Sequence, residues 1–160
     1  LGGNFMETKL FYVVEDDYSA SALYPTKKPW LESLRYNLDV AVEEEDFSQE
    51  ESDEKYQLAK IDASKEAIQT NGFYYSIQEI KIVYQSQKVI IRYYDYNNEV
   101  SLYTFNGESY DYEEDFIICK NYSEDDIAET LRSFIKDEDV NITDLSRDIK
   151  QIMAGGESND

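Results

Sequence analysis

The chain has 160 residues, and its 35 Asp and Glu against 15 Lys and Arg give a formal net charge of −20. It has no histidine and one cysteine, which excludes His-based catalytic triads, an internal disulfide and a zinc site made of Cys and His. The excess of acids argues against direct binding to nucleic acid or to an anionic membrane surface, while 14% aromatic residues indicate a folded protein instead of a disordered acidic tail.

The two ends of the chain differ from the rest in composition and are not expected to belong to the folded domain. Residues 1–5 (LGGNF) precede Met6, which opens an ordinary start, so we interpret them as a remnant of cloning. Residues 154–160 are small or polar and predict a flexible tail. Residues 6–153 have the length of one domain and are predicted to form a single α+β domain.

Residues 9–14 form a short apolar run of β type. Pro29 suits the first turn of a helix, and the apolar residues that follow at helical spacing predict a helix to about Val42. A helix is therefore expected shortly after the first strand.

A second helix is predicted by the capping-box pattern from Ser48 to Glu51. Leu58, Ile61 and Ile68 recur at helical spacing and are expected on its buried face.

From residue 73 to residue 119 the apolar period changes to two. Residues 80–84, 89–93 and 100–104 each alternate, and a fourth strand is expected from Ser109. Asn106-Gly107 is the strongest hairpin signal, because this pair tolerates the positive φ angles of a type I′ turn.

Two more helices are expected after the strands, capped by Ser123 and by Thr143. The predicted fold class is therefore α+β: a three- to four-stranded antiparallel β-meander, with helices before and after it packed on one face.

The acids gather on either side of the predicted sheet. Residues 72–107 carry as many bases as acids, whereas residues 39–54 carry nine acids and no base. We name these nine the first acidic strip: Asp39, Glu43, Glu44, Glu45, Asp46, Glu50, Glu51, Asp53 and Glu54. Residues 108–129 carry nine more, of which seven form the second acidic strip: Asp111, Glu113, Glu114, Asp115, Glu124, Asp125 and Asp126.

Acids at helix starts are commonly explained by the helix dipole and by solubility. A charge of −20 nevertheless exceeds the magnitude of roughly 2–8 that solubility needs, and unpaired like charges cost stability. Both strips are therefore candidate partner-binding surfaces for something basic.

The 15 tyrosines are the second unusual feature. Most suit strands, but alternation must expose some: if Ile91 and Tyr93 point inward, Ile90 and Tyr94 point outward. Tyrosine is frequent at protein interfaces. The exposed aromatic candidates for partner binding are Tyr94, Tyr96, Tyr110 and Tyr112.

In size, acidity, richness in Tyr, Asn and Ile, and lack of catalytic groups, the chain resembles the small acidic inhibitors of phages and mobile elements. These include type II anti-CRISPR proteins and related DNA-mimic inhibitors. The resemblance implies a stoichiometric inhibitor of a basic nucleic-acid-processing protein, such as a Cas9-type nuclease or its guide-RNA complex, acting in the bacterial cytosol.

An immunity protein that neutralises a basic nuclease toxin is the alternative. A carboxylate enzyme using a divalent metal and an acidic scaffolding domain are less favoured. We expect no catalytic, cofactor-binding or metal site, no direct contact with nucleic acid or membrane, and either a monomer or a homodimer.

Overall fold

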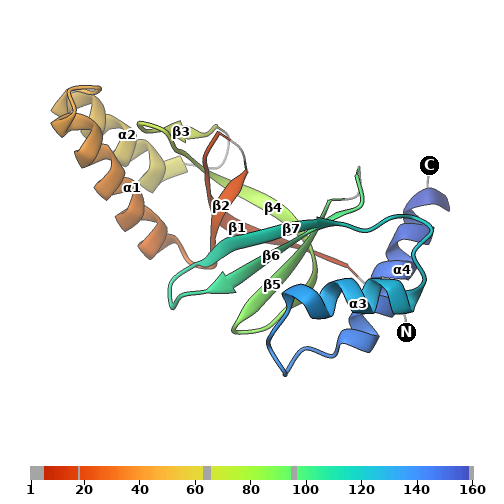
Figure 1. Ribbon diagram of the computed structural model, residues 1–160. Helices are drawn as coiled ribbons and strands as arrows, with labels where there is room; N and C mark the ends of the chain where they lie inside the picture. The colour runs from red at the N-terminus through yellow and green to blue at the C-terminus, as the bar shows by residue number, and fades with distance from the viewer. Residues whose placement is uncertain (1–5, 18, 63–65, 95–96, 159–160) are drawn as a thin grey trace. The chain divides into compact units, whose positions relative to one another are not determined.

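The computed structural model describes residues 6–17, 19–62, 66–94 and 97–158 (Figure 1). Within them, seven strands and four helices follow one another along the chain. The elements are β1 (Glu7–Glu15), β2 (Ala20–Tyr24), α1 (Lys27–Glu43), α2 (Gln49–Asp62), β3 (Ile68–Gln69), β4 (Tyr74–Gln85), β5 (Val89–Tyr94), β6 (Glu99–Phe105), β7 (Tyr110–Ile117), α3 (Glu124–Phe134) and α4 (Ile142–Ser158).

The strands form one sheet in the order β1-β2-β7-β6-β5-β4-β3, and β1 also pairs with β4. This extra pairing closes six strands into an antiparallel barrel, which leaves the two-residue β3 outside. The prediction of a three- to four-stranded meander with helices packed on one face is therefore wrong. The predicted strands are present as β4 to β7, but β1 and β2 complete a barrel, and closure removes the free edges that a meander would leave.

Barrel closure also explains why buried and exposed residues do not alternate along β5. Ile91 and Tyr93 are buried as expected, but Ile90 is buried as well, at 0% exposure. Ile91 and Tyr93 pack in the core that includes α3 and α4, and alternation turns Ile90 to the opposite side, the barrel interior. Both faces of this strand are covered, so Ile90 is not the outward-facing residue that we expected.

The hairpin between β6 and β7 forms at the predicted turn. Gly107 has φ +107°, and Asn106 Oδ1 accepts hydrogen bonds from the backbone N–H groups of Glu108 (2.8 Å) and Ser109 (3.0 Å). Only the glycine has a positive φ, so the turn is not of type I′, which needs two such residues.

The described residues divide into two compact units, and strands β1, β4 and β7 run through both. The hairpin unit comprises residues 10–79 and 106–111 and contains α1 and α2. The C-terminal unit comprises residues 6–9, 80–105 and 112–158 and contains α3 and α4. Each pair of helices has its own apolar core, so the four helices do not share the single layer that we predicted.

Ser123 caps α3 through a complete capping box with Asp126, as predicted. The prediction that Thr143 caps the last helix is wrong, because α4 begins at Ile142 and Asn141 Oδ1 accepts the backbone N–H of Asp144 at 3.0 Å. None of the helices in the described part of the chain has the length and apolar character needed to span a bilayer.

Candidate partner-binding surface

The first acidic strip lies on a helical hairpin, in which α1 and α2 run side by side (Figure 1). Helix α1 buries Trp30, Leu34, Leu38 and Ala41, whose spacing places them on one helical face. The indole Nε1–H of Trp30 donates to the carbonyl of Val13 at 3.1 Å, which fixes α1 against β1. The hairpin is thus anchored by α1.

Helix α2 buries much less of itself. Of its residues from Gln49 to Ile61, only Ser52 and Ala59 are fully buried, and they are small enough to let the two helices approach closely. Leu58 and Ile61, which we expected on the buried face, are 54% and 78% exposed, so that prediction is wrong. Helix α2 ends at Asp62, and Ile68 belongs to β3. The sequence misleads because Ser52 and Ala59, although not strongly apolar, occupy the packed face.

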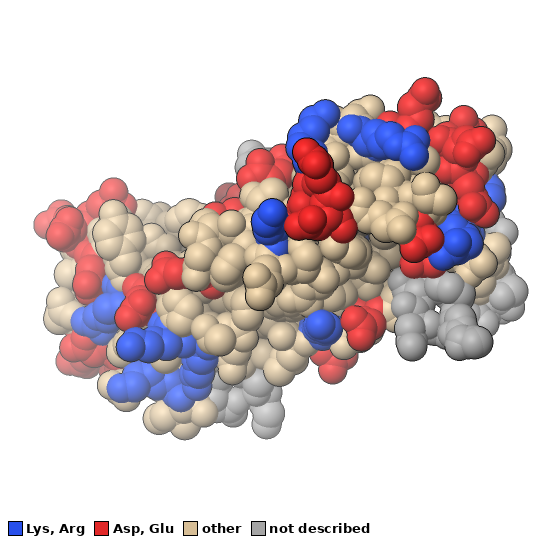
Figure 2. All heavy atoms as spheres, turned by 90° about the horizontal axis from the view of Figure 1, so that it is seen from below, with Lys and Arg blue, Asp and Glu red and all other residues tan. Residues whose placement is uncertain are grey.

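All nine residues of the first acidic strip are exposed, and the hairpin brings them together. Asp39 and Glu43 lie near the end of α1, Glu44 to Asp46 form the turn, and the remaining acids occupy the first two turns of α2. The leftmost acidic atoms in Figure 2 cover this end of the hairpin. We name this end the acidic tip.

The helix dipole does not explain the part of the acidic tip that α1 contributes. The C-terminal end of a helix carries partial negative charge and favours cations, yet the last turn of α1 has no basic residue and contains Glu43. Glu45 has φ +64°, a left-handed conformation usually given to glycine after a helix. Glu43 and Glu45 thus occupy positions that are unfavourable for an acid at the end of a helix and for a residue other than glycine, respectively.

Few of these acids are neutralised within the protein. Arg35 pairs with Asp39 at 3.4 Å and with Asp53 at 2.9 Å. The hydrogen bonds from Arg35 and Gln49 lower the pKa of Asp53 below its usual value. Glu44 accepts from Asn71 Nδ2 at 2.7 Å.

Glu51 forms the predicted capping box with Ser48, which is confirmed by hydrogen bonds of 3.0 and 3.1 Å. The other five acids form no side-chain hydrogen bond or ion pair with the residues that the structure describes: Glu43, Glu45, Asp46, Glu50 and Glu54. Their charge is therefore available to an external partner.

The opposite end of the hairpin carries bases. Lys27 and Lys28 open α1, and the ammonium of Lys27 donates to the carbonyl of Lys60 near the end of α2 at 2.8 Å. In Figure 2, basic atoms gather beside the leftmost group of acidic atoms, which covers the acidic tip. The hairpin is therefore electrically polarised along its length.

An exposed apolar area adjoins the acidic tip on α2. Leu58 and Ile61 line a shallow, open hollow on the exposed face of α2, and Glu50, Asp53 and Glu54 border it. Exposed Leu and Ile side chains beside a ring of carboxylates match the composition of an interface with an apolar centre and a charged rim. Together, the acidic tip and this hollow form the hairpin surface, our candidate for partner binding.

The second acidic strip is dispersed and largely used within the protein. Asp111 belongs to the hairpin unit and accepts hydrogen bonds from Asn106 and Ser109, both at 2.7 Å. Glu113 accepts from Thr104 at 2.7 Å in the C-terminal unit.

Asp115 accepts from Ser101, and Asp126 caps α3. Only Glu114, Glu124 and Asp125 make no side-chain hydrogen bond or ion pair with a described residue. Asp111 belongs to the hairpin unit, and the other six acids are divided between β7 and α3 in the C-terminal unit, so the second strip is not gathered on one pair of elements as the first is.

The four candidate tyrosines differ in exposure. Tyr110 is buried at 5% exposure with its ring edge-on to Phe11, so the prediction that it is exposed is wrong. Tyr94 is half-buried beneath the guanidinium of Arg92, which lies 4.3 Å from the ring centre. Tyr112 is 36% exposed, and Tyr96 lies outside the described residues.

The pKa of Tyr112 is raised to about 12 by desolvation and by the nearby Asp115 carboxylate. Its ring packs edge-on against Tyr103 at 5.9 Å, and burial raises the pKa of Tyr103 as well. Because Tyr112 packs against Tyr103 and is only 36% exposed, it is a weaker interface candidate than the more exposed apolar residues of α2.

Comparison with protein-family models, with curated proteins and with solved structures gives no significant match.

Proposed function

We propose that the protein is an acidic stoichiometric inhibitor that binds a basic nucleic-acid-processing enzyme through the hairpin surface. The first target to test is a Cas9-type CRISPR nuclease, whose binding or cleavage of DNA the protein would block. The observation that carries the proposal is the acidic tip, where nine exposed carboxylates gather and Arg35 pairs with only two of them.

Two properties of the hairpin surface favour a protein partner over a free cation. The unpaired acids can steer a basic surface toward the hairpin and raise the association rate. Leu58 and Ile61 then offer apolar area that slows dissociation once it is covered. We therefore expect the partner to present Lys and Arg side chains around exposed apolar ones.

Titration of the protein into cleavage reactions tests the proposal. A panel of Cas9-type nucleases, restriction enzymes and basic nuclease toxins is assayed with and without the protein. Loss of cleavage at a near-equimolar ratio with one of them supports inhibition. Inhibition confined to a toxin would replace the CRISPR target with the immunity function, and unchanged cleavage across the panel would refute both.

Charge reversal tests the role of the acidic tip. Changing Glu43, Glu44 and Glu45 to Lys should lower the association rate at least tenfold and flatten its dependence on salt. The matched control reverses the three unpaired acids of the second strip, Glu114, Glu124 and Asp125. Equal loss in both triple variants, with melting temperatures preserved, would mean that only the total charge matters.

A further inference from the structure

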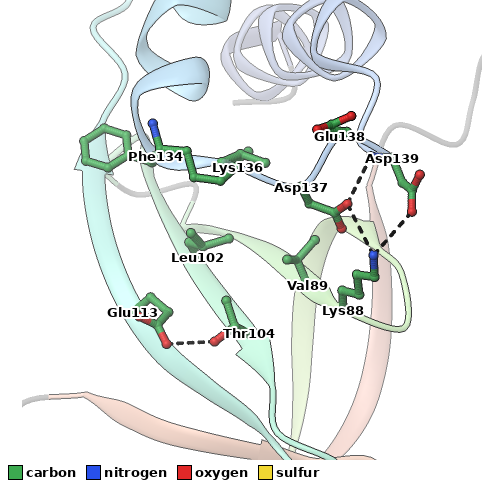
Figure 3. Close-up of a pocket in the computed structure, with 11 residues that line it drawn as sticks. Lys88, Val89, Leu102, Thr104, Glu113, Phe134, Lys136, Asp137, Glu138 and Asp139 are labelled. Atoms are coloured by element: carbon green, nitrogen blue, oxygen red, sulfur yellow. Dashed lines mark hydrogen bonds and ion pairs between the residues drawn. The ribbon is translucent and has the colours of Figure 1, made fainter.

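The C-terminal unit contains a pocket of about 680 Å³ that the hairpin surface does not use (Figure 3). Its apolar wall comes from Val89 on β5, Leu102 on β6, and Phe134 with Ile135 at the end of α3. The volume lies within the range of roughly 300–1,000 Å³ that is typical of small-molecule sites. The pocket is large enough for an apolar chain several carbons long.

Charged side chains surround this apolar wall. The connection between α3 and α4 supplies Asp137, Glu138 and Asp139, and β7 supplies Glu113. Two lysines accompany the four carboxylates, so the lining carries a net charge of −2. An acidic rim over an apolar wall favours a ligand with a cationic head and a hydrocarbon stem.

The environment of Asp137 is the main evidence that the pocket binds a ligand. Its side chain is 9% exposed, which is unusual for a carboxylate. Oδ1 accepts the backbone N–H of Asp139 at 3.0 Å, whereas Oδ2 is buried and has no hydrogen-bond partner among the residues described. Leaving a buried acceptor without a donor is energetically unfavourable, because the group has lost its hydrogen bonds to water. A bound donor would remove this penalty.

Lys88 is the one cation that pairs with Asp137 within the described part of the chain, and it holds the carboxylate loosely. Lys88 Nζ lies 4.0 Å from Asp137 Oδ1 and 3.6 Å from Asp139 Oδ2, both too long for a hydrogen bond (Figure 3). The Lys88 side chain is also 69% exposed. A ligand cation can therefore displace it at little cost.

We infer that this pocket binds a guanidinium or primary ammonium group carried on an apolar stem, with the cation donating to Asp137 Oδ2. The stem lies along Val89 and Leu102. The cation replaces Lys88 beside Asp137 and leaves that lysine in solvent. The same chemistry is found in an arginine side chain of another protein and in a free guanidino or amino compound.

Titration calorimetry with two probes separates these sources. Agmatine represents the free compound, and the tripeptide Gly-Arg-Gly, blocked at both ends, represents a protein side chain. The tripeptide with citrulline in place of arginine is the uncharged control for the second probe. Binding of agmatine supports a free ligand, binding of the arginine tripeptide alone supports a protein side chain, and failure of both at millimolar concentration would overturn the inference.

Matched variants test whether Asp137 is the group that binds. Asp137→Asn should weaken binding at least tenfold, whereas Glu129→Gln, which removes one exposed acid of α3 outside the pocket, should leave it within twofold. Equal weakening in both variants would show that the probe senses only overall charge.

A second pair of variants keeps the inference testable if Asp137→Asn does not fold. Lys88→Gln removes the competing cation and should tighten binding several-fold, whereas Lys81→Gln, an exposed lysine outside the pocket, should not. NMR amide shifts should concentrate near Val89, Leu102 and Phe134. Shifts spread over the acidic tip instead would refute the site.

Discussion

Replacing Leu58 and Ile61 with serine removes the apolar part of the hairpin surface while leaving every acid in place. Both side chains are already largely in solvent, at 54% and 78% exposure, so the folded protein gains little from them. We expect the free energy of unfolding to change by no more than about 0.5 kcal/mol per residue. Binding to the target should respond much more strongly.

The expected loss of binding follows from the exposed fractions. Complete burial of a Leu or Ile side chain is worth about 1.5–3 kcal/mol. Scaling by the fraction that a partner could still cover gives about 2–4 kcal/mol for Leu58 and Ile61 together. At 1.4 kcal/mol per tenfold, this corresponds to a dissociation constant roughly 30- to 700-fold higher.

Surface plasmon resonance on the immobilised target measures this effect. Because the acids remain, the loss should appear mainly in the dissociation rate. Ile117→Ser on β7 is the matched control, since it removes another exposed apolar side chain, at 61% exposure, from the C-terminal unit. If the double variant binds as tightly as the parent, or Ile117→Ser weakens binding equally, the reasoning about the hairpin surface is wrong.

Three further predictions concern stability. Trp30→Ala should cost about 3–5 kcal/mol in urea unfolding, because the indole is completely buried and bonds to the β1 backbone; a loss below 1 kcal/mol would contradict its anchoring role. Ser52→Ala should stabilise the protein by about 1 kcal/mol in the same assay, because the buried Oγ has no partner among the described residues, and a clear loss of stability would show that the hydroxyl is satisfied. Burial, with a smaller effect of Asp115, raises the pKa of Glu99, so the folded protein binds that proton more tightly than the unfolded chain does, and the ionised form is destabilising at neutral pH. Glu99→Gln should therefore melt higher than the parent at pH 7, with the difference fading as the pH falls toward the ordinary Glu value of about 4.3; a variant that melts lower at pH 7 would refute this sign.

Local elements were predictable where a short-range interaction determines them. The two capping boxes at Ser48 and Ser123 depend on residues three apart, and both form as expected. The Asn106-Gly107 turn needs a residue that accepts positive φ, which glycine does. Barrel closure was not predictable in this way, because the pairing of β1 with β4 joins segments about 60 to 75 residues apart and no local pattern specifies it.

The sequence by itself determined that the protein is strongly acidic, that its acids cluster in two runs, and that His-based catalysis is excluded. These properties depend only on which residues are present and on their order. Tertiary structure decided which run forms a surface: the α1–α2 hairpin gathers the first, whereas hydrogen bonds in β7 and at the α3 cap occupy much of the second. It also decided that Leu58 and Ile61 face solvent, because the small residues Ser52 and Ala59 allow α2 to pack closely through its other face. Burial of a side chain depends on what packs against it, and that partner lies elsewhere in the chain.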